Sequence, residues 1–583
     1  MTDVDRARER LARLTPEQRA ALEARLTTPR RPSRTGPPPI PRRPDPGTPA
    51  PLTDAQRRLW VVDQLDPGNP AYTLSWAYTV RGPLDPAAVA AAFDRLVDRH
   101  PLLTHVITVH DGEPRQRPGA ERPRLLIDTL PAEQADAAAR HEARHRFDLA
   151  TGPLTRARLI RVTPHEHRLI LTLHHILADR WSVTILLNDL LDLYAGRDLP
   201  PPGTDYADYA AWQRTQPHTA DLTYWRDTLT GLPDTLDLPA DRPRPAARSH
   251  QGERLLFDLD RGLADALRAL AAAEHATPFM ALTAALQALL ARYTGQADIP
   301  IGTPMSARPH PGLDRTAGLF LNTLVLRGDL SGDPTFTELL RRTRERVLGA
   351  FDHAGLPFEA LVDDLAPGRD LSRNPLFQVM LAYQNTPALP GGDHHDHHGH
   401  DRPGGHGLAL ERLDVRPGTA MFDLDLIVEE RPDGALLCVL DYATDLFDQP
   451  RMRRLAGHLR TLLAAAVADP HTPLSRLDLM DPAELATTLR MGTGTEADHP
   501  DRPLHDLVAE QAARTPHAPA LDGADGTRLT YAQLEARATA LAAHLQRLGV
   551  RPETRVGVCL PRDPRLVVAL LAVLKAGGCY VPL

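Results

Sequence analysis

The sequence predicts an α/β fold arranged as two lobes of similar size, and three observations support this prediction. Helical and strand-like patterns alternate along the chain from about residue 52. A second series of the same kind follows a proline-rich joint at residues 238–245. The chain has 583 residues, enough for about three or four units of ordinary domain size.

The first series predicts strands at residues 71–80 and 168–173, where β-prone side chains predominate. Asp85-Pro86 predicts the start of a helix, because proline is favoured at the first helical position. The apolar residues of this helix lie on one face, at Val89, Phe93, Leu96 and Val97. Residues 182–194 return to helical spacing, with apolar side chains at Ile185, Leu186, Leu190 and Tyr194.

The second series predicts a strand, two helices and two further strands, at residues 254–259, 261–274, 278–293, near Ile299 and at 323–327. After Asp481 the sequence changes to loop. A smaller unit follows, with a helix at 531–548, a strand at 555–560 and a helix ending at Gly577-Gly578. We expect this last unit to stop too soon to bury a complete sheet.

The amino-terminal residues differ in composition from the rest of the chain. Residues 1–27 contain good helix formers, and Thr15-Pro16-Glu17 predicts a helix start. Residues 28–51 are rich in proline and arginine, which predicts an extended linker. The first segment is either a disordered leader or a docking element for a partner protein, and the sequence leaves both open.

Composition excludes several classes of function. A net charge of -8 over this length gives no electrostatic case for nucleic-acid binding. Three scattered cysteines, Cys438, Cys559 and Cys579, favour a reducing, cytoplasmic location over a disulfide framework. The chain begins without an apolar signal region, and its longest aliphatic run, residues 566–574, is too short to span a membrane.

Two adjacent histidines, His174 and His175, end an apolar run, and Asp179 follows four residues after the second. Histidine suits proton transfer near neutral pH, because its unperturbed pKa is about 6.5. His175 is therefore a candidate general base. A histidine beside a strand can equally be a satisfied core residue, and the pattern alone leaves both readings open.

Seven segments between residues 52 and 480 bear on this question: Thr53-Asp-Ala-Gln-Arg-Arg-Leu-Trp60, Asp98-Arg-His-Pro-Leu-Leu103, His174-His-Ile-Leu-Ala-Asp179, Tyr206-Ala-Asp-Tyr-Ala-Ala-Trp212, Ala317-Gly-Leu-Phe-Leu-Asn-Thr323, His353-Ala-Gly-Leu-Pro-Phe-Glu359 and Arg369-Asp-Leu-Ser-Arg-Asn-Pro-Leu376. In this order they resemble the condensation domains of nonribosomal peptide synthetases. Each segment alone is weak evidence, whereas the ordered series is strong.

The resemblance implies two chloramphenicol-acetyltransferase-like lobes in a V-shaped pseudo-dimer with a central tunnel. It places the lobes at 52–225 and 226–480, followed by a linker at 481–503. Residues 504–583 are similar to the start of an adenylation domain, through Leu529-Thr-Tyr-Ala-Gln-Leu-Glu535 and Leu574-Lys-Ala-Gly-Gly-Cys-Tyr-Val-Pro-Leu583. No phosphate-binding loop follows these residues, so we expect no activation of amino acids with ATP.

The resemblance also implies peptide-bond formation between a donor thioester and an acceptor aminoacyl thioester. An upstream and a downstream carrier protein would present both substrates on phosphopantetheine, with no cofactor bound covalently to this chain and the adenylation domain adjoining. His175 corresponds to the catalytic histidine, which acts as a base or orients the acceptor amine, and His174 is expected to be structural. Asp179 is expected to brace the site by pairing with Arg308. Ser182 and Asn322 are predicted to give structural support.

Arg180 departs from the family pattern, which has glycine after the aspartate. Glycine at this position leaves room beside the histidine. In the family its N–H has been assigned a role in holding the developing oxyanion. Arg180 keeps the N–H and adds a long cation. Its side chain either points outward or lies in the tunnel, where it would contact an anionic acceptor group or narrow the passage; we favour an altered acceptor site.

Two further features have a structural and a functional reading. Asp393-His-His-Asp-His-His-Gly-His-Asp401, with His406, contains good zinc ligands, yet its flanking glycines and prolines favour an inserted loop without a functional metal. Tyr206 to Trp212 is aromatic at helical spacing, which predicts packing in the core.

The predicted function is therefore amide-bond formation in a condensation domain. A heterocyclisation domain would carry an aspartate pair in place of the histidines, and the downstream adenylation start argues against an epimerisation domain. The segment 369–376 is closer to domains that use L-configured donors. A noncatalytic platform that recruits carrier proteins or accessory enzymes is the alternative, and Arg180 is the feature that favours it. Ester formation with an alcohol acceptor is a third possibility.

Overall fold

A computed structural model describes residues 39–45, 47–233, 235–306, 308–365, 370, 372–384, 407–415, 418–494, 498–524 and 526–583. The predicted helices of residues 1–27 and the His-rich segment at 393–401 lie outside these ranges. The chain divides into two compact units, residues 1–485 and 486–583.

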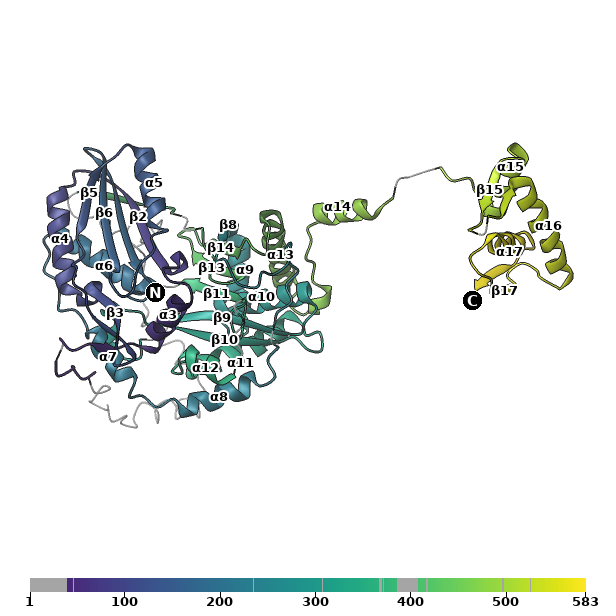
Figure 1. Cartoon of the computed structure of the whole chain (residues 1–583). Coiled ribbons are helices and arrows are strands. Elements are labelled where there is room, and N and C mark those ends of the chain that lie inside the picture. The colour runs from purple at the N-terminus through teal and green to yellow at the C-terminus, as the bar shows by residue number, and fades with distance from the viewer. Residues whose placement is uncertain are drawn as a thin grey trace, which may run out of the picture. The chain divides into compact units, whose positions relative to one another are not determined.

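The first lobe of the larger unit is built on a five-stranded sheet (Figure 1). Its strands, in spatial order, are β12 (Ala409–Leu413), β2 (Thr73–Arg81), β7 (Glu166–His174), β6 (Thr155–Thr163) and β5 (Leu125–Thr129). The helices α4 (Pro86–Arg99) and α6 (Arg180–Tyr194) pack on one face, and α5 (Ala132–Glu142) packs on the other. The alternation of apolar side chains along β2 separates these two cores.

The second lobe contains a six-stranded sheet, in the spatial order β10 (Leu321–Asp329), β9 (Asp298–Ser306), β11 (Val379–Gln384), β13 (Leu424–Glu430), β14 (Leu436–Ala443) and β8 (Gly252–Leu259). One continuous apolar core joins this sheet to α9 (Arg261–Ala273), α10 (Pro278–Thr294), α11 (Phe336–Asp352) and α13 (Gln449–Ala468). Two shorter helices, α8 (Thr219–Leu229) and α12 (Phe358–Leu365), border it. The predicted alternation of helices and strands is thus confirmed in both lobes.

One strand crosses between the lobes. Strand β12 lies in the part of the sequence expected to form the second lobe, yet it pairs antiparallel with β2 over residues 409–413. Its five residues carry no strong strand signal, because an edge strand is defined by a distant partner and not by its own composition. The predicted division of the chain into two lobes therefore does not apply to this strand.

The packed part of the chain begins before residue 52. Strand β1 (Ala50–Pro51) joins β4 (Glu113–Pro118) and β3 (His105–His110) in a small sheet, and Ile40 is buried. Arg43 binds the carboxylate of Asp208 in α7 (Tyr206–Gln213) at 3.1 Å. The end of the segment assigned to a linker from its composition is therefore held against the first lobe. The exact domain limits stay predictions, as do the V shape and the central tunnel.

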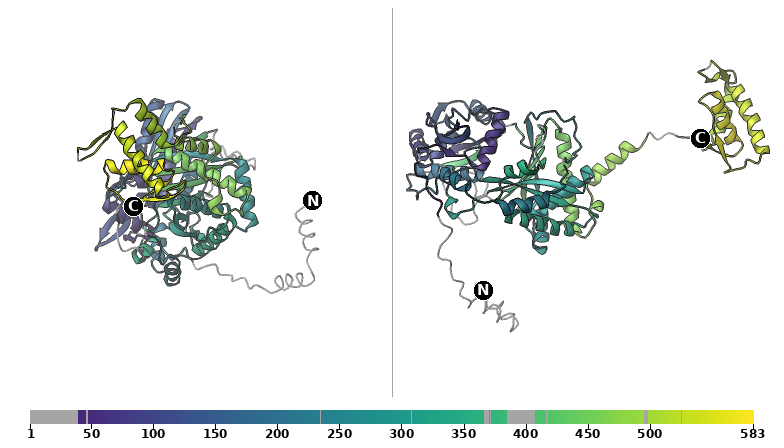
Figure 2. Two further views of the ribbon diagram at one scale, coloured as in Figure 1. Left: turned by 90° about the vertical axis from the view of Figure 1, so that its right-hand side faces the viewer. Right: turned by 60° about the horizontal axis from the view of Figure 1, so that its bottom comes forward.

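The smaller unit holds two two-stranded sheets, β15 (Pro519–Asp522) with β16 (Arg528–Thr530), and β17 (Arg555–Val558) with β18 (Cys579–Pro582). Its helices are α15 (Leu504–Arg514), α16 (Tyr531–Arg547) and α17 (Pro564–Lys575), and the last two pack against each other (Figure 2). Leu504, Leu548 and Leu583 are exposed. The helix α14 (Pro482–Gly492) contains the point at which the chain divides into the two units.

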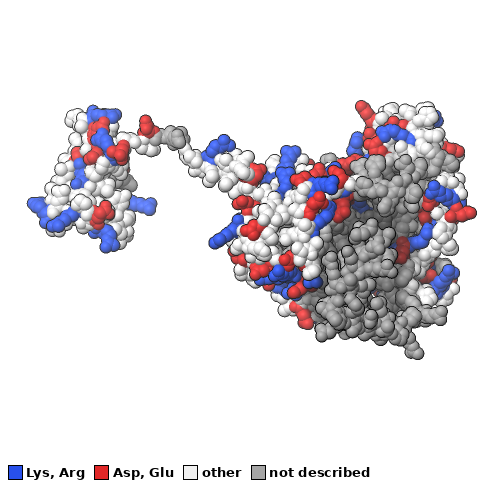
Figure 3. All heavy atoms as spheres, turned by 180° about the vertical axis from the view of Figure 1, so that it is seen from behind, with Lys and Arg blue, Asp and Glu red and all other residues white. Residues whose placement is uncertain are grey.

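Charges are distributed over the described surface without a basic face in the view of Figure 3, where blue and red side chains are interspersed. Among the described residues, no helix combines the length and hydrophobicity that a membrane span requires.

Candidate active site

His175 lies in the turn between β7 and α6. Its backbone N–H donates to the carbonyl of Tyr72 at 2.8 Å, and Nδ1 lies 2.8 Å from the carbonyl oxygen of Ala178. Because a carbonyl only accepts, Nδ1 carries the proton, and Nε2 of the neutral ring keeps its lone pair. Among the described residues no hydrogen bond engages Nε2, and the side chain is partly exposed. This is the geometry of an available base.

Electrostatics also keep His175 neutral. Burial lowers the pKa of His175, since it disfavours the charged imidazolium. The hydrogen bond to Ala178 and the carboxylate of Asp179 act in the opposite direction, and the positive charge of Arg58 adds to the lowering. At neutral pH the ring is therefore able to accept a proton.

His174 has the opposite surroundings. It is 3% exposed, its Nδ1 accepts from the N–H of Ile176 at 3.1 Å, and the edge of Phe147 packs on its ring. Burial, with the neighbouring His175, lowers the pKa of His174 to about 3. These contacts fit the predicted structural role.

Asp179 is the N-cap of α6 and is 2% exposed. Its Oδ1 accepts from the N–H and the hydroxyl of Ser182, at 2.8 and 2.6 Å, and its Oδ2 accepts from the N–H of Phe320 at 3.1 Å. Both oxygens are thus engaged in holding the helix start to the segment that precedes β10.

Arg308 completes this junction from the second lobe. Its Nη2 lies 3.6 Å from Oδ1 of Asp179 and 3.1 Å from the hydroxyl of Ser182. Its Nη1 donates to the carbonyls of Leu313 and Thr316, and its guanidinium lies over the ring of Phe320. The structure thus brings together Asp179, Arg308 and Ser182, although Arg308 lies far from the other two along the chain.

Gly318 shows how tightly this junction is packed. Its carbonyl accepts from the N–H of Asp179 at 3.1 Å, and its N–H donates to Ser182 at 2.9 Å. A Cβ added to Gly318 would lie 2.0 Å from the ring of Tyr206. Tyr206 and Tyr209 are buried, so the prediction that this aromatic segment belongs to the core is confirmed.

Gln56 is a supporting residue that was not predicted from the sequence. It lies in α3 (Asp54–Leu65), where Thr53 and Gln56 form a capping box. Its Nε2 donates to the carbonyl of Ile176 at 3.1 Å, directly after His175. The Thr53–Gln56 spacing was the available signal, because it marks a capping box. Nothing in the sequence indicates that the glutamine also reaches the histidine turn.

Asn322 fixes the approach to α12. Its Nδ2 donates to the carbonyls of Ala354 and Leu356, at 3.0 and 2.8 Å, and its Oδ1 accepts from the N–H of Phe358 at 3.1 Å. The neighbouring residue Glu359 pairs with Arg58 of α3 at 3.6 Å, and this ion pair links the two lobes.

Arg180 is the first residue of α6 and forms an ion pair with Glu429 of β13, with Nη1 and Oε1 3.0 Å apart. Its backbone is helical, so the site does not need the conformational freedom of glycine here. Burial lowers the pKa of Arg180, and Glu429 opposes this effect.

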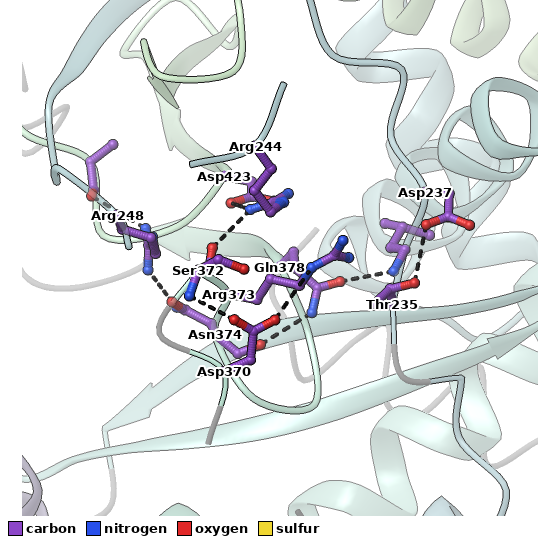
Figure 4. Close-up of polar contacts among 12 residues, drawn as sticks. Thr235, Asp237, Arg244, Arg248, Asp370, Ser372, Arg373, Asn374, Gln378 and Asp423 are labelled. Carbon is purple, nitrogen blue, oxygen red and sulfur yellow. Dashed lines mark hydrogen bonds and ion pairs between the residues drawn. The ribbon is translucent and has the colours of Figure 1, made fainter. Parts of the chain in front are cut away.

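The described part of segment 369–376 is tied to the loop before β8 (Figure 4). Arg244 donates to the carbonyl of Ser372 at 3.0 Å and forms an ion pair with Asp423. Arg248 donates to Asn374. Arg369 and Leu371 lie outside the described residues.

A cavity of about 960 Å³ lies between the lobes. The first lobe contributes the walls formed by Asn69, Pro70, Arg144 and Arg146, and the second contributes residues near 249–254, 418–419 and 441–449. Pro70 lies two residues before Tyr72, and Arg146 precedes Phe147. The first-lobe residues that line the cavity are therefore close in sequence to Tyr72 and Phe147, which contact the histidine pair.

Within the described ranges, no three His, Cys, Asp or Glu side chains are grouped as metal ligands. The segment at 393–401 and His406 are not part of those ranges, so the expectation of no functional metal there stays a prediction.

Two α/β lobes with a His-His-x-x-x-Asp turn at their junction define the chloramphenicol-acetyltransferase-like class. Residues 48–488 match the family model of the condensation domain, and residues 508–583 match that of the AMP-binding enzyme. The chain therefore belongs to the condensation-domain family of nonribosomal peptide synthetases and continues into the start of an AMP-binding domain.

Curated relatives agree with this assignment. Phosphinothricin tripeptide synthetase PhsB of Streptomyces viridochromogenes is 40% identical over 556 residues, covering 92% of this chain and 46% of that protein. Bacitracin synthase 3 of Bacillus licheniformis is 36% identical over 543 residues, covering 91% of this chain and 8% of that protein. The chain thus spans less than half the length of either relative.

Solved structures share the fold. The four-domain nonribosomal peptide synthetase AB3403, bound to AMP and glycine, has a TM-score of 0.78 at 24% identity, covering 92% of this chain and 42% of that one. The X-domain from teicoplanin biosynthesis, in complex with OxyB, has a TM-score of 0.68 at 29% identity, covering 77% of this chain and 99% of that one.

Proposed function

We propose that the chain forms an amide bond between a donor acyl or peptidyl thioester and an acceptor aminoacyl thioester, both presented by carrier proteins. The observation that carries this proposal is that Nε2 of His175 has no hydrogen bond among the described residues. The hydrogen bond from Nδ1 to the carbonyl of Ala178 holds the neutral ring in the tautomer that leaves Nε2 unprotonated. The phosphopantetheine of the carriers supplies the two thioesters.

In this mechanism the acceptor amine attacks the donor carbonyl carbon, a C–N bond forms, and the C–S bond breaks. Nε2 of His175 orients the amine and receives its proton, which then passes to the departing thiolate. The N–H of Arg180 is at the first position of α6 and has no intrahelical acceptor, so it is a candidate donor to the developing oxyanion.

The remaining predicted residues have positioning roles. Asp179, Ser182 and Arg308 hold the start of α6 to the second lobe, and Asn322 holds the approach to α12. His174 supports the turn. We propose that a phosphopantetheine arm enters through the cavity of about 960 Å³. Its first-lobe lining residues are close in sequence to Tyr72 and Phe147, which contact His175 and His174. The adjoining adenylation domain and the two carriers are the proposed partners.

A noncatalytic platform is the second candidate. The X-domain that resembles this chain is found in complex with OxyB, and Arg180 occupies the position that the family pattern gives to glycine. The neutral, partly exposed His175 argues for catalysis.

The test loads donor and acceptor aminoacyl groups on carrier proteins and compares product formation by wild type, His175→Ala and His471→Ala. His471 is an exposed histidine of the second lobe and serves as the matched control. We expect His175→Ala to lower the rate by about 10²- to 10⁴-fold, while His471→Ala keeps wild-type activity.

Equal inactivity of wild type and His175→Ala across several substrate pairs would favour the platform. A hydroxyacyl acceptor in place of the aminoacyl acceptor tests ester formation, since the same base serves both nucleophiles.

A further inference from the structure

The backbone of Arg180 is fixed at the start of α6, and its side chain extends to the second lobe. The backbone is held because Asp179 caps α6 and accepts from Phe320 at 3.1 Å. The guanidinium reaches the other lobe, where Nη1 lies 3.0 Å from Oε1 of Glu429. The ion pair therefore joins the helix that follows the His175 turn to the second sheet.

Glu429 lies near the end of β13, just before the chain turns back into β14 of the same sheet. It is opposite Leu437 of β14 and beside Gln384, the last residue of β11. By the alternation of β13 it shares a face with Asp425 and Ile427. The side chain is 24% exposed, so the ion pair is only partly screened by solvent.

A second arginine makes Glu429 important to this junction. Arg412 of β12 pairs in register with Tyr78 of β2. Burial lowers the pKa of Arg180, and the positive charge of Arg412 lowers it further. Within the described structure, the hydroxyl of Tyr78 and Nε of Arg180 are buried without a hydrogen-bond partner. Glu429 therefore provides a negative charge that opposes the effect of Arg412 on Arg180.

Two other ion pairs link the lobes around His175. Arg58 pairs with Glu359 at 3.6 Å, and Arg308 pairs with Asp179 at 3.6 Å. The Arg180–Glu429 contact is shorter than either. Glycine at position 180 would have no side chain to reach Glu429, so this third link depends on the residue that departs from the family pattern.

We propose that Glu429 is a positioning residue, and that its pair with Arg180 clasps the two lobes and sets the width of the predicted tunnel beside His175. Because the guanidinium of Arg180 is already paired with Glu429, the pair acts by narrowing this tunnel and not by offering a free cation to an anionic acceptor. The effect on acceptor choice rests on the proposed amide-forming function, whereas the clasp itself does not.

The test uses the full chain with Arg180→Gln, Glu429→Gln and the charge swap Arg180→Glu with Glu429→Arg. Arg197→Gln is the matched control, because Arg197 pairs with Asp192 at 2.6 Å within the first lobe. The first readout is kcat/KM for a bulky and a small aminoacyl acceptor, such as tryptophan and alanine. Each single variant should raise the bulky-to-small ratio by about 3- to 10-fold, and the swap should restore it to within about twofold of wild type.

The second readout is the distance between spin labels on cysteines introduced at the exposed positions Asp94 and Arg460, one in each lobe. Cys559 and Cys579 are replaced by serine in all variants, so that the labels stay specific. The single variants should broaden the distance distribution, and the swap should narrow it again. An unchanged distribution in both single variants overturns the clasp.

The two readouts separate the two proposals. A broadened distribution together with an unchanged acceptor ratio keeps the clasp and overturns its role in acceptor choice. If no variant and no wild-type sample forms product, the amide-forming function fails, while the distance distribution still decides the clasp.

Discussion

At residue scale, the two adjacent histidines differ because of what their Nδ1 atoms contact. Nδ1 of His175 faces a carbonyl, which fixes a proton on that nitrogen, whereas Nδ1 of His174 faces an N–H and must be unprotonated. Neighbours in sequence thus hold opposite tautomers. Only His175 presents its basic nitrogen at a partly exposed position.

The pH dependence of catalysis follows from the direction of the His175 shift. Burial lowers the pKa of His175, and the neutral ring is the active form. Activity should therefore persist at pH values just below about 6.5, the ordinary pKa of histidine. It should decline only when the pH falls to the lowered pKa of His175. The measurement is kcat/KM against pH in single-turnover peptide formation. An acid limb centred at or above 6.5 would contradict the assignment of His175 as the base.

His174 makes the stability of the larger unit depend on pH. Its pKa is about 3 when folded, against about 6.5 when unfolded, so the unfolded chain binds more protons between these values. Stability is complete above about 6.5 and is lost as the pH falls toward 3. His174→Asn keeps an acceptor for Ile176 and removes the titration. Urea unfolding should show that wild type loses up to roughly 2 kcal/mol more than His174→Asn between pH 6.5 and 5. His471→Asn, at an exposed site, should behave as wild type.

At element scale, the start of α6 is a joint made by four segments. Residues from α3, the turn after β7, α7 and the segment before β10 meet there through Gln56, Asp179, Tyr206 and Gly318. Because these segments interlock, a change in one should move the His175 turn.

Gly318→Ala tests this joint. The added Cβ would lie 2.0 Å from the ring of Tyr206, so the chain must shift. We expect a loss of about 1–3 kcal/mol in the free energy of unfolding and a lower kcat. Gly457→Ala in α13 is the matched control, since its Cβ would meet open space and should stabilise the helix by about 0.5–1 kcal/mol. Equal behaviour of the two variants in urea unfolding would argue against the interlocked joint.

The elements that the sequence predicts best have local signals. Asp85 caps α4, and the apolar positions Val89 and Phe93 are buried on one face. Strand β12 was missed because its identity depends on pairing with β2, hundreds of residues away. Within the site, the histidine motif is local, but Gln56 and Glu429 contribute through long-range contacts that no spacing reveals. The pairing of Asp179 with Arg308 was predicted only through family resemblance.

At the scale of the whole molecule, the two lobes are connected by a strand and by ion pairs. Strand β12 is supplied to the first sheet by the part of the chain that otherwise builds the second lobe. This exchange connects the lobes through backbone pairing, and side-chain links such as Arg180–Glu429 add to it. The molecule thus joins its lobes both by a strand and by ion pairs.

The two compact units should unfold separately. The smaller unit has only two small buried clusters among its described residues, around Leu534 and Ala542, whereas the larger has extended cores. Because small units bury a lower fraction of their surface, we expect the smaller one to melt first in calorimetry. Leu534→Ala, at a site 3% exposed, should lower only the first transition, and Leu289→Ala, at a fully buried site in α10, only the second. Each change should cost about 2–5 kcal/mol. A single transition lowered by both variants would show instead that the units unfold cooperatively.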